Sequence, residues 1–207
     1  MSARCTLEFE ESLRAAGFNT VAGVDEAGRG PLAGPLMVAA VILPPNFVHP
    51  RLNDSKKLSA SARRKIFKEL SNHSEIVSCV VEISSEEVDR LNILRATHEG
   101  MRRAVAGLST PPDHALIDGL PVRPFPLPQT ALVKGDARSL SIAAASILAK
   151  VTRDERMEEL DAQYPQYAFA KHKGYGTALH LERLRVHGPC PIHRRSFAPV
   201  AQASLSL

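Results

Sequence analysis

Two adjacent carboxylates, Asp25 and Glu26, stand at the end of an apolar run that begins at Thr20. Carboxylates at the end of a buried strand are costly unless they are paired, hydrogen-bonded or bound to a metal. Hard cations such as Mg²⁺ and Mn²⁺ prefer oxygen ligands of this kind. Because neighbouring strand residues point to opposite faces, both side chains can serve one site only if the strand ends or bulges there. We expect the chemistry of the chain to begin at this pair.

A glycine-rich stretch follows the two carboxylates. Gly28 and Gly30 can supply the break in the strand, since glycine accepts positive φ and lets a ligand approach the backbone. With Ala33 they also fit the dinucleotide pattern G-x-G-x-x-G/A. However, Pro31 and Pro35 interrupt the helix that this pattern requires, and the carboxylates would repel a pyrophosphate. A strand that ends in a polar glycine-rich turn is the plain structural alternative.

The apolar periodicity predicts strands and helices around this stretch. Strands are expected over 20–26, 36–43, 75–83, 114–119 and 131–133, with the first two antiparallel because their connection is tight. Helices are expected over 7–16, 59–70, 85–107 (in segments) and from 141 to about 157. The first has its acidic residues on the face away from its apolar residues. Ser59 is expected to cap the second helix, and Ser84 with Glu87 has capping-box spacing.

Length and composition limit the class of protein. The 207 residues fit one domain, predicted over 1–199 with a helical C-terminal region from about 160 and a tail over 200–207. A formal charge of +4 is compatible with nucleic acid as a partner. The three cysteines form no CxxC pair, so no disulfide framework is expected. The N-terminus lacks the apolar core of a signal peptide, and no run can span a membrane, so we expect a cytoplasmic protein.

Several separated blocks of the sequence resemble the type 2 ribonucleases H, the ribonuclease HII family. The blocks are DEAGRGPLAGP, DSKKLS, HALIDG, KGDA with the helix that follows it, HKGYGT and HRRSFAP. They cover roughly residues 20–199 in the family's order. The related type 3 class carries an extra N-terminal domain, for which the residues before Asp25 leave no room. The resemblance implies an α/β protein with the ribonuclease H-like fold, a mixed five-stranded sheet flanked by helices.

The resemblance also implies a catalytic site that binds metal ions. Its carboxylates, as catalytic residues and metal ligands, would be Asp25, Glu26, Asp118 and Asp136. Two divalent ions, Mn²⁺ or Mg²⁺, about 4 Å apart can clamp the attacking and leaving oxygens of a phosphodiester. Asp154 is a second candidate ligand, but Lys150 lies one helical turn before it, and a surface ion pair is the simpler interpretation.

Substrate contacts follow from the resemblance as well. The implied substrate-binding residues are Gly28, Arg29, Gly30, Lys56, Lys173 and Tyr175. The glycine-rich segment would surround the ribose 2′-hydroxyl, which distinguishes RNA from DNA, and the lysines would hold phosphates. Tyr175 would stack on the adjacent sugar. A half-buried anchor in a glycine-rich turn is the alternative for this tyrosine.

The implied activity is that of an endoribonuclease on RNA–DNA hybrids, with a role in ribonucleotide excision repair. It would include incision on the 5′ side of single ribonucleotides in duplex DNA, leaving a 3′-hydroxyl and a 5′-phosphate. One alternative is a metal-dependent nuclease of the same fold that acts on plain DNA. Another is a protein that binds hybrids without cutting them, although pure binding would not need four carboxylates.

The last residues, Gln202–Leu207, resemble the short peptides that bind bacterial sliding clamps. A glutamine is followed by leucines three and five residues later. In that mode an extended peptide places apolar side chains in a surface groove. A frayed or locally packed tail is the alternative.

Overall fold

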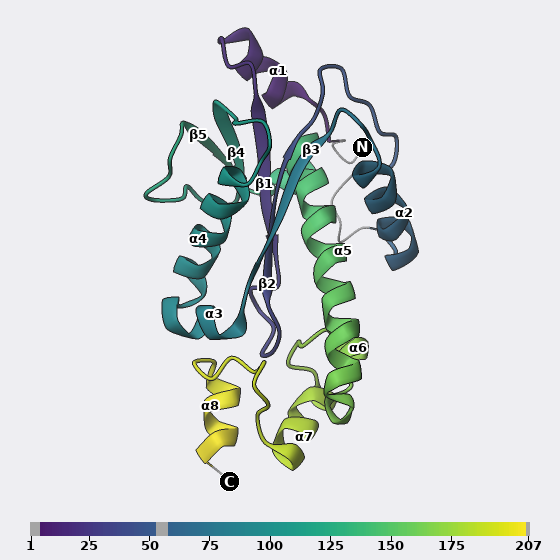
Figure 1. Ribbon diagram of the computed structural model, residues 1–207, viewed down its shortest axis with the longest axis vertical. Helices are drawn as coiled ribbons and strands as arrows, with labels where there is room; N and C mark the ends of the chain where they lie inside the picture. Colours follow the sequence, from purple (N-terminus) through teal and green to yellow (C-terminus); the bar gives the residue numbers. More distant parts are fainter. Residues whose placement is uncertain (1–4, 53–57, 206–207) are drawn as a thin grey trace.

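The computed structural model describes residues 5–52 and 58–205 (Figure 1). Its centre is a five-stranded sheet with the order β3-β2-β1-β4-β5. The strands are β1 (Val21–Ala27), β2 (Leu36–Ile42), β3 (Val77–Ile83), β4 (His114–Asp118) and β5 (Gln129–Leu132). β2 is antiparallel to β1 and β3, whereas β4 is parallel to β1 and β5. The predicted mixed five-stranded sheet is confirmed, as is the antiparallel pairing of its first two strands.

Helices flank the sheet and form the C-terminal region. They are α1 (Glu8–Ala15), α2 (Ala60–Ser71), α3 (Ser85–Leu91), α4 (Ile93–Ala106), α5 (Leu140–Gln163), α6 (Phe169–His172), α7 (Ala178–His187) and α8 (Ala198–Leu205). Both predicted caps are confirmed. The Ser59 hydroxyl accepts the Ala62 N–H, and Ser84 with Glu87 forms a reciprocal capping box. Among the described residues, no helix is both long and apolar enough to cross a membrane.

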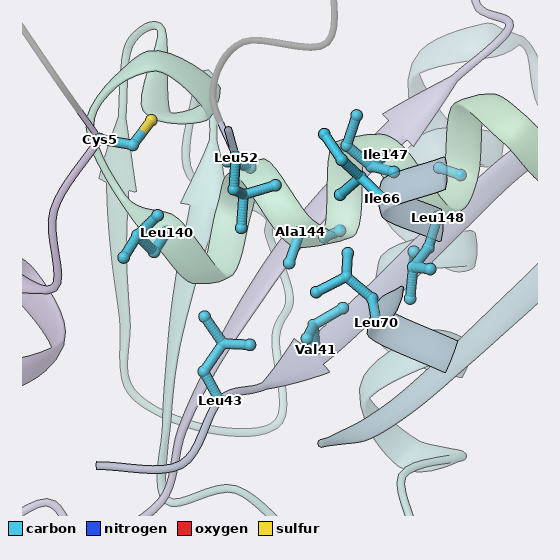
Figure 2. Packing of buried hydrophobic residues seen from close by; sticks show 14 of the residues in the cluster. Cys5, Val41, Leu43, Leu52, Ile66, Leu70, Leu140, Ala144, Ile147 and Leu148 are labelled. Carbon is cyan, nitrogen blue, oxygen red and sulfur yellow. The ribbon is translucent and has the colours of Figure 1, made fainter. Parts of the chain in front are cut away.

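The sheet is covered on both faces. Alternate residues of β2 point to opposite sides, as strand geometry requires. Met37, Ala39 and Val41 pack against α2 and α5, and Figure 2 shows this layer of interlocking aliphatic side chains. Val38 and Ala40 pack against α3 and α4. Every residue of β2 is therefore buried, which explains its uninterrupted apolar sequence.

Helix α5 lies unusually close to β1. Its small residues Ala143, Ala144 and Ala145 are fully buried. At the contact, β1 carries Gly23, and a Cβ built there would lie 2.2 Å from the Ser141 carbonyl carbon and 2.4 Å from the Ile142 nitrogen. Those atoms are backbone and cannot rotate away. The absence of a side chain at Gly23 thus sets the distance between α5 and the central strand.

The acidic face expected on the first helix is only partly exposed. Glu10 of α1 is buried at the start of α5, contrary to the simple amphipathic pattern. Its carboxylate accepts hydrogen bonds from the hydroxyls of Ser139 and Ser141, both at 2.6 Å, and from the Ser141 N–H at 3.0 Å. A carboxylate is stabilised there by unpaired N–H groups and by the helix dipole. The N-terminal helix therefore fixes the start of α5.

The C-terminal tail expected from residue 200 begins inside a helix. α8 covers Ala198–Leu205, and Val200 is fully buried against Leu32 and Leu184. Ala203 packs against the same cluster. Gln202 and Ala203 are consequently helical in this structure, not extended, because the apolar contacts of α8 order them.

We predict that Gly23→Ala destabilises the fold. The added methyl group would overlap α5 backbone, and overpacking of this kind costs about 1–3 kcal/mol of unfolding free energy. Denaturant unfolding checks the value. Gly30→Ala is the matched control, because its Cβ would meet nothing closer than Tyr175 Cε1 at 3.9 Å. Equal stability of the two variants would contradict the proposed close contact.

Candidate active site

Strand register brings two of the predicted carboxylates together. β1 and β4 are parallel and paired up to Val24 and Ile117, so Asp25 and Asp118 are the next residues on neighbouring strands. Gly23, two residues before Asp25, faces α5, and Asp25 shares that face. Ser146 of α5 hydrogen-bonds the Asp25 carboxylate. Two carboxylates far apart in sequence are thus adjacent because they follow the last paired residues of two parallel strands.

The side chain of Glu26 reaches the same site as Asp25 and Asp118 in a way that the sequence did not indicate. β1 pairs with β2 without interruption through Ala27 and Met37, so the strand neither ends nor bulges between Asp25 and Glu26. The expected end of the strand comes one residue after Glu26, at Ala27, directly before Gly28 with its φ of 102°. Pairing of β1 with β4 stops at Val24, which leaves one flank of β1 open beyond that point. Side chains from both faces of the strand can reach this open flank.

These residues line one cavity of about 290 Å³. Its lining consists of Asp25, Glu26, Ala27, Gly28, Arg29, Gly30, Arg63, Asp118, Ser146, Lys150 and Tyr175. Three of the four carboxylates singled out from the sequence therefore face the same space as the glycine-rich segment and Tyr175. A larger groove of about 460 Å³, formed around Pro44–His49, contains none of them.

The electrostatics of the cavity favour a cation. Burial, followed by the charges of Glu26 and Asp118, raises the pKa of Asp25 well above its ordinary value. Burial also raises the pKa of Glu26, against the opposing effect of Arg29. Like charges this close disfavour full ionisation unless a cation lies among them. The atoms that could coordinate a metal ion here are carboxylate oxygens, which are the ligands that Mg²⁺ and Mn²⁺ prefer.

Two of the carboxylates accept hydrogen bonds from backbone N–H groups in the described conformation. No set of three or more acidic, histidine or cysteine side chains in the described part of the chain has the geometry of a metal cluster. Asp25 Oδ1 instead accepts the Glu26 N–H at 2.7 Å, and Asp118 Oδ1 accepts the Gly135 N–H at 2.7 Å. Mutual repulsion favours such separate hydrogen bonds.

Asp136 lies beside this group but not in the cavity lining. It is buried in the 3₁₀ turn Gly135–Ala137, directly after the residue whose N–H binds Asp118. The Cys5 thiol donates to its carbonyl oxygen at 3.1 Å. The fold thus brings the fourth predicted carboxylate next to the site, one residue from a direct contact with Asp118.

Two buried arginines hold the glycine-rich loop. Arg194, from the segment before α8, donates to the carbonyl oxygens of Gly28 at 2.7 Å, Arg29 at 3.0 Å and Gly34 at 2.9 Å. Arg153 of α5 donates to the carbonyls of Ala33, Pro35 and Lys173. Burial lowers the pKa of Arg153 to about 10 and that of Arg194 to about 9, so both keep their charge at neutral pH. Neither forms a salt bridge with a described residue.

This arrangement orients the peptide groups of the loop. In a trans peptide the carbonyl and the following N–H point in opposite directions. Because the carbonyls of Gly28 and Arg29 point to Arg194, the N–H groups of Arg29 and Gly30 point away from it. Gly28 has φ of 102°, a left-handed conformation that favours glycine. The result is a pair of backbone donors at the edge of the carboxylate cavity.

A chain of histidines fixes the backbone of Tyr175. Cys190 N–H donates to His193 Nδ1 at 3.0 Å, so the neutral His193 ring is assigned its proton on Nε2. The His193 Nε2–H donates a hydrogen bond to His180 Nε2 at 3.1 Å, and His180 Nδ1–H donates to the Tyr175 carbonyl at 2.9 Å. Burial lowers the pKa of both histidines to about 4, so both rings are neutral at pH 7. The Tyr175 ring is 44% exposed and lies 5.9 Å from the Arg153 guanidinium.

Of the two lysines predicted to contact phosphate, only Lys173 is described, and it does not line the cavity. Lys56 falls outside the described residues. Lys173 Nζ pairs with Glu158 at 2.8 Å. The predicted ion pair between Lys150 and Asp154 is confirmed at 2.6 Å, and Asp154 does not line the cavity.

Several residues of the site were missed in the sequence. Arg63, Ser146 and Lys150 line the cavity, and Arg153 and Arg194 support its loop. From the sequence, Lys150 could be paired with Asp154 one helical turn away, but not placed in the cavity. Arg194 stood in a recognised block, HRRSFAP, but nothing in the spacing indicated that its partners were carbonyl groups.

We predict that Arg194→Lys destabilises the protein by roughly 2–4 kcal/mol, measured by denaturant unfolding. A lysine cannot reproduce the forked guanidinium, and each buried carbonyl left without a donor costs about 1–3 kcal/mol. The control is Arg195→Lys, at the exposed neighbouring residue, which should change the unfolding free energy by less than about 0.5 kcal/mol. Similar losses in both variants would refute this role of Arg194.

Comparison with known proteins agrees with the family indicated by the sequence blocks. The family model described as Ribonuclease HII matches residues 22–200. A ribonuclease HII of Geobacillus kaustophilus is 52% identical over 201 residues, covering 95% of this chain and 75% of the relative.

Solved structures show the same fold. The crystal structure of the ribonuclease H2 from Pyrococcus horikoshii OT3 has a TM-score of 0.77 at 27% identity, covering 90% of this chain and 98% of that one. The RNase HII in the PCNA:RNase HII complex from Archaeoglobus fulgidus has a TM-score of 0.65 at 28% identity, covering 84% and 93% of the two chains. The fold is therefore ribonuclease H-like, and the chain belongs to the ribonuclease HII family.

Proposed function

We propose that this chain, an endoribonuclease of RNA–DNA hybrids, also cuts duplex DNA at single embedded ribonucleotides. Incision is on the 5′ side of the ribonucleotide and leaves a 3′-hydroxyl and a 5′-phosphate. One observation carries the proposal. The carboxylates of β1 and β4 share a cavity with the Gly28–Gly30 backbone and Tyr175, so groups suited to hydrolysis and groups suited to reading a sugar meet in one place.

The carboxylates are proposed to act as metal ligands. Asp25, Glu26 and Asp118 would hold Mn²⁺ or Mg²⁺, and Asp136 would complete the set from the neighbouring turn. The raised pKa values of Asp25 and Glu26 support this role, because a bound cation relieves the repulsion that raises them. When bound, such ions supply Lewis acidity for phosphodiester hydrolysis. Ser146 orients Asp25 by a hydrogen bond.

The substrate contacts are proposed from the loop and the tyrosine. The N–H groups of Arg29 and Gly30 point away from Arg194 and can donate to phosphate or to the 2′-hydroxyl. The exposed Tyr175 ring offers a surface for the adjacent sugar. Lys173 would contact a phosphate only by sharing or leaving Glu158, and Lys56 keeps its proposed phosphate contact from the resemblance alone.

The test compares two duplexes that differ in one 2′-hydroxyl. With Mg²⁺ or Mn²⁺, we expect cleavage of the duplex with one ribonucleotide to exceed that of the all-DNA duplex by orders of magnitude. Gel analysis of the cut position and of the product ends completes the test. Equal cleavage of both duplexes would instead indicate a nuclease for plain DNA.

A variant of one carboxylate is the control for this assay. Asp118→Asn removes a charge at almost constant shape, so turnover should nearly disappear while duplex binding persists. A variant that keeps most of its rate would exclude Asp118 as a ligand.

We also propose that residues Gln202–Leu207 bind a sliding clamp. The RNase HII of Archaeoglobus fulgidus, a relative by structure, was solved in complex with PCNA, which is such a clamp. An extended binding mode requires the end of α8 to unwind, since Gln202 and Ala203 are helical here.

Truncation after Ala201 tests this tail. The shortened chain keeps the buried Val200, so nuclease activity should persist while binding to the organism's own clamp is lost. Titration by surface plasmon resonance measures the difference. Equal clamp binding by the full and shortened chains would exclude the tail as the contact.

A further inference from the structure

A second concave surface, separate from the carboxylate cavity, is strongly basic. It has a volume of about 420 Å³ and lies between the end of α3, helix α4 and the loop before β5. Its lining consists of Arg90, Leu91, Arg95, His98, Glu99, Arg102, Arg103, Arg123 and Pro124. Five arginines thus face a single carboxylate, and no lining residue is shared with the catalytic cavity.

Two of the arginines form the framework of this surface. Arg102 and Arg103 both bind Glu99, at 2.8 Å each, and Arg103 also binds Glu87 at 2.9 Å. Arg102 additionally donates to the Pro124 carbonyl at 3.0 Å, which ties the loop to α4. The only carboxylate of the lining is therefore already engaged.

The other three arginines are exposed and have no such partner. Arg90, Arg95 and Arg123 form no salt bridge with any described residue. They come from three different segments but face one concavity. Arg95 also lies in the first turn of α4, where no acidic residue balances the positive end of the helix dipole. Glu87, whose pKa the Arg90 charge helps to lower, is already bound by Arg103. The remaining repulsion among the arginines is unfavourable, and an anion would relieve it.

The basic concavity is connected to the catalytic loop. Asp89, next to Arg90, accepts hydrogen bonds from the N–H groups of Arg195 at 2.7 Å and Ser196 at 2.9 Å. The preceding residue, Arg194, holds the carbonyls of the glycine-rich loop. Figure 1 shows α3 near the same end of the sheet as the loop between β1 and β2. The two surfaces therefore keep a fixed relative position.

His98 gives an independent sign of this proximity. It lines the concavity, and burial is the main reason that its pKa lies below the ordinary value. The charge of Arg29, which lines the catalytic cavity, contributes to the same lowering. Arg29 and His98 are therefore close enough for their charges to interact.

We propose that Arg90, Arg95 and Arg123 bind backbone phosphates of the nucleic-acid duplex away from the cleavage position. Guanidinium groups match the geometry of phosphate oxygens and remain charged at any physiological pH. The contact adds affinity without reading sequence. This inference rests on the proposed function for the identity of the substrate and extends its contact beyond the cut.

The experiment measures duplex affinity without cleavage. Arg95→Gln and Arg123→Gln, singly and together, are titrated by fluorescence anisotropy with a labelled duplex containing one ribonucleotide, in the absence of divalent cations. We expect Kd to rise by roughly tenfold per arginine at 0.1 M salt, and the slope of log Kd against log salt to fall by about one per arginine. In cleavage assays KM should rise while kcat stays unchanged.

The matched control is Lys68→Gln, an exposed cation on α2, on the opposite face of the sheet. It should leave Kd and the salt slope unchanged. Unchanged values in the double arginine variant, or an equal loss in Lys68→Gln, would overturn the proposal. If the unmodified chain fails to cut at the ribonucleotide, the proposed function fails, but the affinity comparison still decides whether these arginines bind the duplex.

Discussion

The glycine-rich loop is held by two charges that have no salt-bridge partner among the described residues. Arg194 and Arg153 satisfy their guanidinium groups with backbone carbonyls, and three carbonyls of Gly28–Gly34 converge on Arg194 alone. A buried charge is tolerated only where dipoles replace its water. The loop must therefore keep these carbonyls turned inward, and the N–H groups of Arg29 and Gly30 face away from Arg194 as a consequence. The C-terminal region, which supplies Arg194, is bound to the sheet by the same contacts.

Helix α5 contacts both the carboxylates and the glycine-rich loop of the site. Its Ser146 binds Asp25, its Lys150 lines the cavity, and its Arg153 holds the far end of the loop. These three residues are spaced at about one helical turn, so one face of the helix reaches all of them. The face can approach the strand because β1 has Gly23 at the contact. A change in this single distance would move Ser146 and Lys150 relative to Asp25.

The site contains both acidic and basic side chains. Carboxylates cluster at the open flank of β1, where burial and mutual repulsion raise the pKa of Asp25. Three cationic side chains, Arg29, Arg63 and Lys150, line the same cavity, where Arg29 pairs with Glu26. Such a site attracts metal cations to its centre and phosphate to its rim. The basic surface of α4 extends this rim, which suits a long polyanion better than a small ligand.

The sequence alone determined those features that depend only on residues close together in the chain. Strand positions, the capping box at Ser84 and the Lys150–Asp154 ion pair were predictable, because each depends on periodicity or on spacing of three or four residues. The recognised blocks also identified the family. Only the tertiary structure decided how Glu26 reaches the cavity, since the length of β4 leaves the flank of β1 open. The tertiary structure alone also revealed the role of Arg194. Its partners are backbone carbonyls up to 166 residues away in the chain, and backbone groups are the same whatever the sequence.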